Sequence, residues 1–208
     1  MGKKIDLNTW KRKPQYDFFK TFEQPFFNVT ANVDISEYYA YLKQHKQPFF
    51  LGMLHAVLTT VNQLSAFKYR LQGKEVWEYE TINSGITILK EDETFMYCTV
   101  AYHKELADFI EQSQQAIAAQ KAARGFVPHT QPNVIYVSSL PWISFTSVQH
   151  AHQQHRGDSI PRFVFGKYFE QGDRLLLPLA VEVHHALADG FHVGQFFEQL
   201  QEKLHIKT

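Results

Sequence analysis

The chain has 208 residues, of which 44% are hydrophobic and 15% aromatic, enough for one sizeable core but short for two domains. Lysine plus arginine equals aspartate plus glutamate at 21 each, which excludes a net positive field that would attract nucleic acid or an anionic membrane. Cys98 is the only cysteine, so an intramolecular disulfide and a CxxC metal site are both excluded, and a reducing cytoplasmic location is expected.

The N-terminal third predicts one strand and two helices. The first residues, MGKKIDLNTW, contain no apolar run, so we expect no signal peptide, and no later segment approaches the length of a membrane span. Val29 to Asp34 alternates weakly and predicts a short strand. Ile35 to His45 predicts a helix capped by Asp34 or Ser36, and Phe49 to Leu64, apolar on most sides, predicts a buried central helix.

The middle of the chain changes character twice. Lys68 to Tyr102 is rich in β-branched and aromatic residues, and we expect several antiparallel strands with turns at Gln72-Gly73 and Asn83-Ser84-Gly85. His103 to Arg124 is rich in Ala, Gln, Glu and Lys, which predicts an exposed helix. The sheet is therefore expected to resume only after this helix.

The segment from Val134 to Val148 is strand-like again and is interrupted at Leu140-Pro141. It is followed by HAHQQH, from His150 to His155, whose three imidazoles have a spacing that a metal site could use. No acidic or thiol ligand accompanies this run, so we interpret it as a surface loop and expect no metal. Arg162 to Val183 then predicts a hairpin that turns at 170–173.

The most informative stretch is LLLPLAVEVHHALADGFHVGQFFEQL, from Leu175 to Leu200. It opens with an apolar run containing a single charge, which predicts a core strand, and continues with apolar residues at helical spacing. His184 and His185 therefore lie on a strand-to-helix connector, and Asp189 is placed to cap the helix. An oriented imidazole there can accept and return a proton, although two adjacent histidines are more often ordinary loop residues.

Three motifs in this chain resemble those of one enzyme family. HHALADGFHVG resembles the HHxxxDGFHVG signature of the chloramphenicol acetyltransferases, the short members of the CoA-dependent acyltransferases. WKR near the N-terminus and SSLPW after residue 137 resemble the family's Trp-x-Arg and Ser-x-x-Pro-Trp motifs, in the same order. The resemblance implies one catalytic domain over residues 1–208, an α/β (α+β) two-layer sandwich with a mostly antiparallel sheet covered by helices.

The resemblance also implies a role for each matching residue. His185 is the general base, Asp189 has a structural role in an ion pair with Arg12, and Ser138 donates a hydrogen bond to the developing oxyanion. The remaining family positions correspond to the CoA-binding residues Trp142, Lys167 and Tyr168 and the acceptor-pocket residues Phe18, Phe19 and Phe126. Read without the resemblance, Ser138 is an ordinary strand residue and the Phe18-Phe19 pair is equally well explained as core.

The implied reaction is transfer of an acetyl group from acetyl-CoA to a hydroxyl group of chloramphenicol, without a metal. The implied assembly is a homotrimer with active sites between subunits, where His185 comes from one protomer and Ser138 with the aromatic pocket from its neighbour. No nucleic-acid or membrane partner is implied.

Three residues depart from the family's acceptor pocket. Glu23 and His150 stand where the known resistance enzymes tend to have apolar residues, and Val164 replaces a threonine. An acyltransferase of the same mechanism with a different acceptor is therefore the second interpretation. A dihydrolipoyl acyltransferase core also contains HxxxDG, but no lipoyl domain or linker accompanies it here. A non-catalytic binding protein with this fold is the third interpretation, and the joint presence of the four catalytic residues argues against it.

Overall fold

A computed structural model describes residues 1–123, 130–152 and 157–206. Its centre is a seven-stranded sheet in which β9 (Phe169–Gln171) pairs with β10 off the main path. The main path runs in the order β2 (Phe26–Asp34), β10 (Arg174–His184), β8 (Arg162–Phe165), β7 (Val134–Ser139), β5 (Asn83–Leu89) and β6 (Phe95–Val100). The pairs β5–β7 and β7–β8 are parallel and the others antiparallel, so the expected mostly antiparallel sheet is confirmed.

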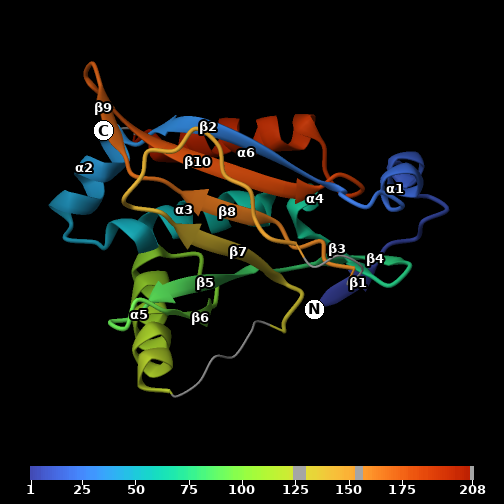
Figure 1. Ribbon diagram of the computed structural model, residues 1–208, viewed down its shortest axis with the longest axis horizontal. Helices are drawn as coiled ribbons and strands as arrows, with labels where there is room; N and C mark the ends of the chain where they lie inside the picture. Colours follow the sequence, from blue (N-terminus) through green and yellow to red (C-terminus); the bar gives the residue numbers. More distant parts are fainter. Residues whose placement is uncertain (124–129, 153–156, 207–208) are drawn as a thin grey trace.

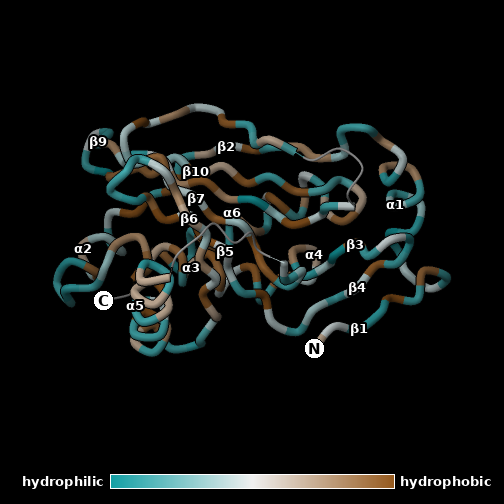
Figure 2. Tube along the Cα trace, turned by 60° about the horizontal axis from the view of Figure 1, so that its bottom comes forward, coloured by the Kyte–Doolittle hydropathy of each residue, from teal (hydrophilic) through white to brown (hydrophobic). Residues whose placement is uncertain are grey.

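Helices pack against one face of this sheet (Figure 1). The central one, α3 (Phe49–Gln63), has nine of its fifteen residues buried, as its apolar sequence predicts. It packs against α2 (Ser36–Gln44), α5 (Leu106–Ala122) and α6 (Gly190–Leu204). One core cluster lies between these helices and the sheet, and Figure 2 shows the hydrophobic segments gathered along the central strands. No helix in the described residues is long and apolar enough to cross a bilayer.

The opposite face of the sheet is crossed by residues 140–152 and 157–161, here called the covering segment, which contain no helix (Figure 1). Side chains alternate along a strand, so Val181 and Val183 of β10 face the helix side, where they join the core. Glu182 and His184 therefore face the segment on the other side. This alternation decides which residues share a face with the candidate active site.

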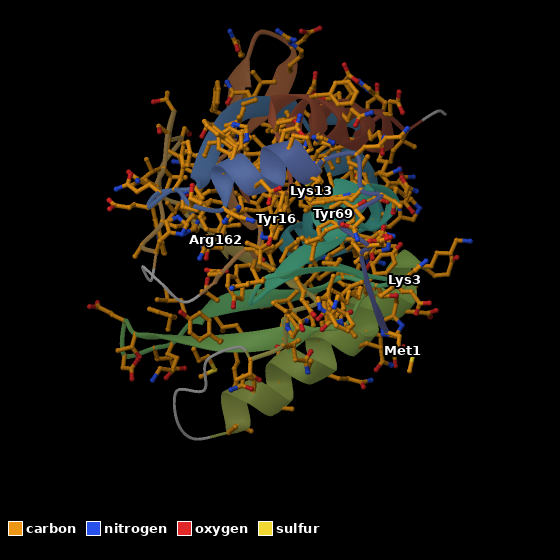
Figure 3. All side chains as sticks on the ribbon, turned by 90° about the vertical axis from the view of Figure 1, so that its right-hand side faces the viewer. Met1, Lys3, Lys13, Tyr16, Tyr69 and Arg162 are labelled. Atoms are coloured by element: carbon orange, nitrogen blue, oxygen red, sulfur yellow. The ribbon has the colours of Figure 1, made fainter. Side chains whose placement is uncertain are left out.

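A smaller sheet closes one end of the molecule. It has the strand order β1 (Gly2–Lys4), β4 (Glu75–Tyr79) and β3 (Tyr69–Gln72), and it adjoins the short helices α1 (Lys13–Phe19) and α4 (Ser65–Lys68). Figure 3 views this end, with Tyr16 of α1 and Tyr69 of β3 labelled close together. Under it lies a second core cluster, formed by Tyr16, Val76, Ala186 and Leu187.

Two sequence predictions about the strands are wrong. Asn83-Ser84-Gly85 is not a turn but the start of β5, where Ser84 is fully buried between β6 and β7 and bonds to the Ile135 carbonyl. Small polar residues fit there because neighbouring strands lie on both sides. The strand-like pattern up to Val148 also overestimates β7, which ends at Ser139, and the residues after it form the covering segment.

Candidate active site

The connector between β10 and α6 runs from His185 to Asp189, where the sequence places it. Asp189 is the N-cap residue of α6, and its Oδ1 accepts a hydrogen bond from the Phe191 backbone N–H at 3.1 Å. This bond satisfies one of the amide groups that a helix N-terminus leaves unpaired. Ala186 and Leu187 are buried in the second core cluster, so packing holds the connector at its middle as well.

Arg12 and Asp189, 177 residues apart in the sequence, form an ion pair of 2.6 Å between Nη1 and Oδ2. Arg12 also donates from Nη2 to the backbone carbonyl of His185 at 3.2 Å. Burial acts to raise the pKa of Asp189, but hydrogen bonds from Arg12 and His192 outweigh it and hold the pKa at about 2. Asp189 is therefore ionised at neutral pH, and the pair ties the N-terminal segment to the connector.

His185 is held by ring contacts and by its backbone. The Phe19 ring stacks on the imidazole with centroids 3.8 Å apart and planes within 5°, and Phe27 contacts it at 4.7 Å. The His185 backbone N–H donates to the Pro25 carbonyl at 2.8 Å. Its Nδ1 atom is buried and has no hydrogen-bond partner among the described residues. Stacking and backbone contacts therefore set the ring plane.

His184, the other histidine of the pair, has a different environment. It is the last residue of β10 and is buried, and burial lowers its pKa to about 4. Its Nδ1 accepts a hydrogen bond from the Ala186 backbone N–H at 3.2 Å. A neutral, buried imidazole that bonds to the connector backbone has a structural role, so His185 is the candidate base of the two.

Ser138 lies in β7 on the face crossed by the covering segment. Its Oγ accepts a hydrogen bond from Thr87 Oγ1 at 3.2 Å, which leaves the Ser138 hydroxyl proton available to another acceptor. Ser138 pairs with Val164 of β8, and Val164 pairs with Ala180 of β10. His185 lies five residues after Ala180 along the chain. On a regular sheet this separates Ser138 from His185 by about 17 Å along the strands and about 10 Å across them. One chain does not bring the two together.

The three predicted CoA-binding residues lie on two segments that are connected by a backbone hydrogen bond. The Lys167 backbone N–H donates to the Ile143 carbonyl at 2.8 Å, next to Trp142, whose side chain is 64% exposed. Tyr168 is also exposed, and its ring packs against Phe49 at 5.6 Å. Gly166 permits this close approach, because a Cβ there would lie 3.0 Å from Phe145 and 3.2 Å from the Ile143 carbonyl. Two exposed aromatic rings beside a lysine suit a ligand with an adenine ring and phosphates.

A cavity of about 1100 Å³ lies between α1, the strand end of β10 and the covering segment. Glu23 and His150, the two residues that depart from the family's acceptor pocket, both line it, together with Phe22 and Phe26. The third departure, Val164, is buried and on the same sheet face. Sequence positions far apart thus converge on one cavity.

The three predicted aromatic residues of the acceptor pocket have different outcomes. Phe19 stacks on His185 and contacts Phe22, a residue of the cavity wall, with centroids 5.1 Å apart. Phe18 is 61% exposed and contacts both of these rings. Phe126 lies outside the described residues.

The sequence predicts that the histidine run is a surface loop. Residues 150–152 are in no helix or strand, as predicted, but two of their side chains are less exposed than expected. His150 and His152 are partly buried against the sheet, and burial lowers the pKa of His150. His152 Nε2 lies 3.0 Å from Oε1 of Glu182, a β10 residue only 3% exposed. Sequence reasoning missed Glu182, although the single charge in an otherwise apolar strand was the signal. In the described part of the chain no group of three or more His, Cys, Asp or Glu side chains is placed to hold a metal.

Comparisons with known proteins agree with this geometry. The family model described as chloramphenicol acetyltransferase matches residues 2–201. The chain is 32% identical over 200 residues to a chloramphenicol acetyltransferase of Proteus mirabilis, covering 95% of this chain and 92% of that protein. It is also 32% identical over 206 residues to one of Streptomyces acrimycini, covering 96% and 93%.

Solved structures give the same result. A chloramphenicol acetyltransferase structure superimposes with a TM-score of 0.88 at 28% identity, covering 99% of this chain and 100% of that chain. A dihydrolipoamide acetyltransferase of Azotobacter vinelandii superimposes with a TM-score of 0.71 at 16% identity, covering 92% and 85%, which supports the fold alone.

Proposed function

The chain belongs to the chloramphenicol acetyltransferase family, and on that premise we propose that it transfers an acetyl group from acetyl-CoA to a hydroxyl group of chloramphenicol. The whole of residues 1–208 acts as one catalytic domain. The observation that carries the proposal is the Arg12–Asp189 ion pair, because the resemblance pairs these two distant residues and they are bonded at 2.6 Å. The same pair fixes the connector that carries His185.

His185 acts as the general base. It takes the proton from the acceptor hydroxyl while the oxygen attacks the thioester carbonyl carbon of acetyl-CoA. When the tetrahedral intermediate collapses, the carbon–sulfur bond breaks and the imidazolium returns the proton to the CoA sulfur. The Phe19 stack and the Arg12 bond to the His185 carbonyl restrict where this ring sits. General-base catalysis by such a group contributes about 10²- to 10⁴-fold in rate.

Ser138 stabilises the negative charge on the former carbonyl oxygen. Thr87 supports this role, because its hydroxyl donates to Ser138 and orients the Ser138 proton outward. Along the strands, Ser138 lies between two features. On one side is the Glu182–Arg162 pair beside the cavity, and on the other is the backbone contact between Lys167 and Ile143, next to Trp142. An acceptor in the cavity and acetyl-CoA on the exposed rings would thus approach Ser138 from opposite ends, as direct transfer requires.

The active site is completed by a second copy of the chain in a homotrimer. This part of the proposal is supported by the separation of Ser138 from His185 within one chain, about 17 Å along the strands. Co-expression of His185→Ala and Ser138→Ala chains tests it, since mixed trimers would regain sites in which both residues are intact. Activity that stays at the level of the separate variants would contradict a shared site.

We also propose that the enzyme works in the cytoplasm, where acetyl-CoA is available, and that it confers resistance to chloramphenicol. Its single cysteine, Cys98, is buried and free, which suits a reducing compartment. A host that loses the gene is expected to become more sensitive to the antibiotic, as measured by its growth at graded concentrations.

The decisive experiment mixes purified protein with acetyl-CoA and chloramphenicol and follows release of the CoA thiol, with His185→Ala alongside. Release that depends on both chloramphenicol and His185 is the expected result. Acetyl-CoA binding without release would favour the second candidate, an acyltransferase for another acceptor, which the charged Glu23 and the polar His150 of the cavity already suggest. Failure to bind either substrate would favour the non-catalytic interpretation.

A further inference from the structure

The inner wall of the cavity contains polar atoms without partners. Glu182 is 3% exposed, and its Oε1 bonds to His152 while its Oε2 is buried and unpartnered among the described residues. Nδ1 of His152 and Nε2 of His150 are likewise buried and unpartnered. Leaving a buried polar group unpaired is unfavourable, so a wall with three such atoms is built to meet something else.

The pattern of donors and acceptors defines what that partner is. His152 donates from Nε2 to Oε1 of Glu182 at 3.0 Å, and its Nδ1 lies on the opposite edge of the ring. The other oxygen of the Glu182 carboxylate, Oε2, is an acceptor that remains without a donor among the described residues. A ligand group with N–H donors and a positive charge satisfies this carboxylate oxygen, which describes a protonated amine.

The cations near the cavity do not already neutralise Glu182. Arg162, its neighbour on β8, is paired with Asp158 and lies over the Phe26 ring at 4.9 Å. Lys13 and Lys20 are at least 40% exposed and both pair with Asp17 at the rim. Apart from Glu182, the cavity is lined by equal numbers of lysines and carboxylates, namely Lys13, Lys20 and Lys74 and Asp17, Glu23 and Asp158. Glu182 on the inner wall has no lysine or arginine bonded to it among the described residues.

We propose that Glu182 determines acceptor specificity and that the preferred acceptors are amino alcohols, whose ammonium group pairs with Glu182 while a hydroxyl group is acetylated. This inference rests on the proposed acetyltransferase function and narrows its substrate class. The cavity volume of about 1100 Å³ admits a drug-sized molecule, and Phe22 and Phe26 give an aryl ring apolar contacts. Glu182 therefore favours aryl alcohols that contain an ammonium group over those that contain a neutral amide.

Two substrates with one scaffold test the proposal. Chloramphenicol contains a neutral dichloroacetamide, and its deacylated amine contains an ammonium group at the same carbon. We expect wild-type protein to acetylate the hydroxyl of the amine with the higher kcat/KM. Glu182→Gln keeps the side-chain shape and removes the charge, and should lower kcat/KM for the amine by about 10- to 100-fold while changing that for chloramphenicol less than about threefold.

Glu23→Gln is the matched comparison, because it removes the same charge from an exposed position of the same cavity. Solvent screening should limit its effect on the amine to about threefold. Calorimetric binding of the amine to the Glu182→Gln and wild-type proteins gives a readout that does not depend on turnover.

The outcomes separate the inference from the function on which it rests. Acetylation of chloramphenicol with no preference for the amine, or equal losses on both substrates in Glu182→Gln, would overturn the specificity role and leave the proposed function intact. If neither compound is acetylated although acetyl-CoA binds, the proposed acceptor is wrong. Amine binding that is as tight in Glu182→Gln as in the wild type would then overturn the role of Glu182 as well.

Discussion

The connector and the cavity lie at the C-terminal end of β10, and their polar residues differ in their hydrogen-bond partners. On the connector side, the Asp189 carboxylate accepts from Arg12, from the α6 backbone and from His192. The atoms left without a partner there, among the described residues, are Nε of Arg12 and Nδ1 of the base His185. On the cavity side, Glu182, His150 and His152 each keep a buried atom that has no partner in the described part of the chain. The first set positions a catalytic group, and the second faces a substrate.

The comparison predicts that the largest loss of activity comes from the connector side. His185→Ala should lower kcat by about 10²- to 10⁴-fold, because it removes the proton acceptor while Arg12 and Asp189 still hold the connector. Steady-state thiol release measures kcat, and the thermal unfolding midpoint serves as the control for folding. An active, folded His185→Ala protein would exclude His185 as the base and would indicate that the base is one of the cavity residues.

Substitution of Ser138 tests the role of the sheet face on which the cavity also lies. Ser138→Ala should lower kcat by about 10²-fold with little change in KM, since its hydrogen bond to the oxyanion exists fully only in the transition state. Thr87→Val should cause a smaller loss, because Thr87 only orients the Ser138 proton. A larger effect on KM than on kcat in Ser138→Ala would mean that Ser138 binds the ground-state substrate.

The sequence predicted the two sides unequally. His185, Asp189 and the strand-to-helix connector followed from the motif and the apolar pattern, because local hydrogen bonds and burial dictate them. For His150 and His152 the sequence predicts a surface loop, and Glu182 stands out in it only as the one charge of an apolar strand. Their meaning depends on a fold that brings residues thirty positions apart to 3.0 Å, which no local pattern encodes.

The strand errors have a similar cause. Asn83-Ser84-Gly85 has the composition of a turn, yet it begins a strand with neighbours on both sides, because tertiary pairing outweighs local propensity. Asn83 still uses its side chain in a loop-like way, since its Oδ1 accepts from the Tyr102 backbone N–H at 2.9 Å. The distance between Ser138 and His185 was likewise invisible until the register of three strands was known.

The ion pair predicts a loss of stability that the cavity residues should not cause. Arg12→Ala should lower the free energy of unfolding by about 1.5–3 kcal/mol, because it leaves the Asp189 carboxylate without its charged donor. The measurement is equilibrium denaturation in urea at neutral pH. A loss below about 0.5 kcal/mol would place this pair among surface salt bridges of little value.

The pH dependence of the same pair has a definite sign. The pKa of Asp189 is about 2 in the folded protein and 3.8 as the ordinary value, so its ionisation stabilises the fold above about pH 4. This contribution should disappear as the pH falls from about 4 through about 2. The difference in unfolding free energy between wild type and Asp189→Asn should therefore be constant near neutrality and shrink in that acidic window.

The smallest effect is expected where only the orientation of the base changes. Phe19→Leu keeps an apolar residue beside His185 but removes a ring stacked at 3.8 Å. Aromatic pairing of this kind contributes about 0.5–1.5 kcal/mol, so kcat should fall by about 2- to 12-fold as the ring leaves its reactive orientation more often. Phe19→Tyr preserves the stack and should restore kcat. If Phe19 instead lined the acceptor pocket alone, Phe19→Leu would raise KM and leave kcat unchanged, so the division between the two constants assigns this residue to the connector side or to the cavity.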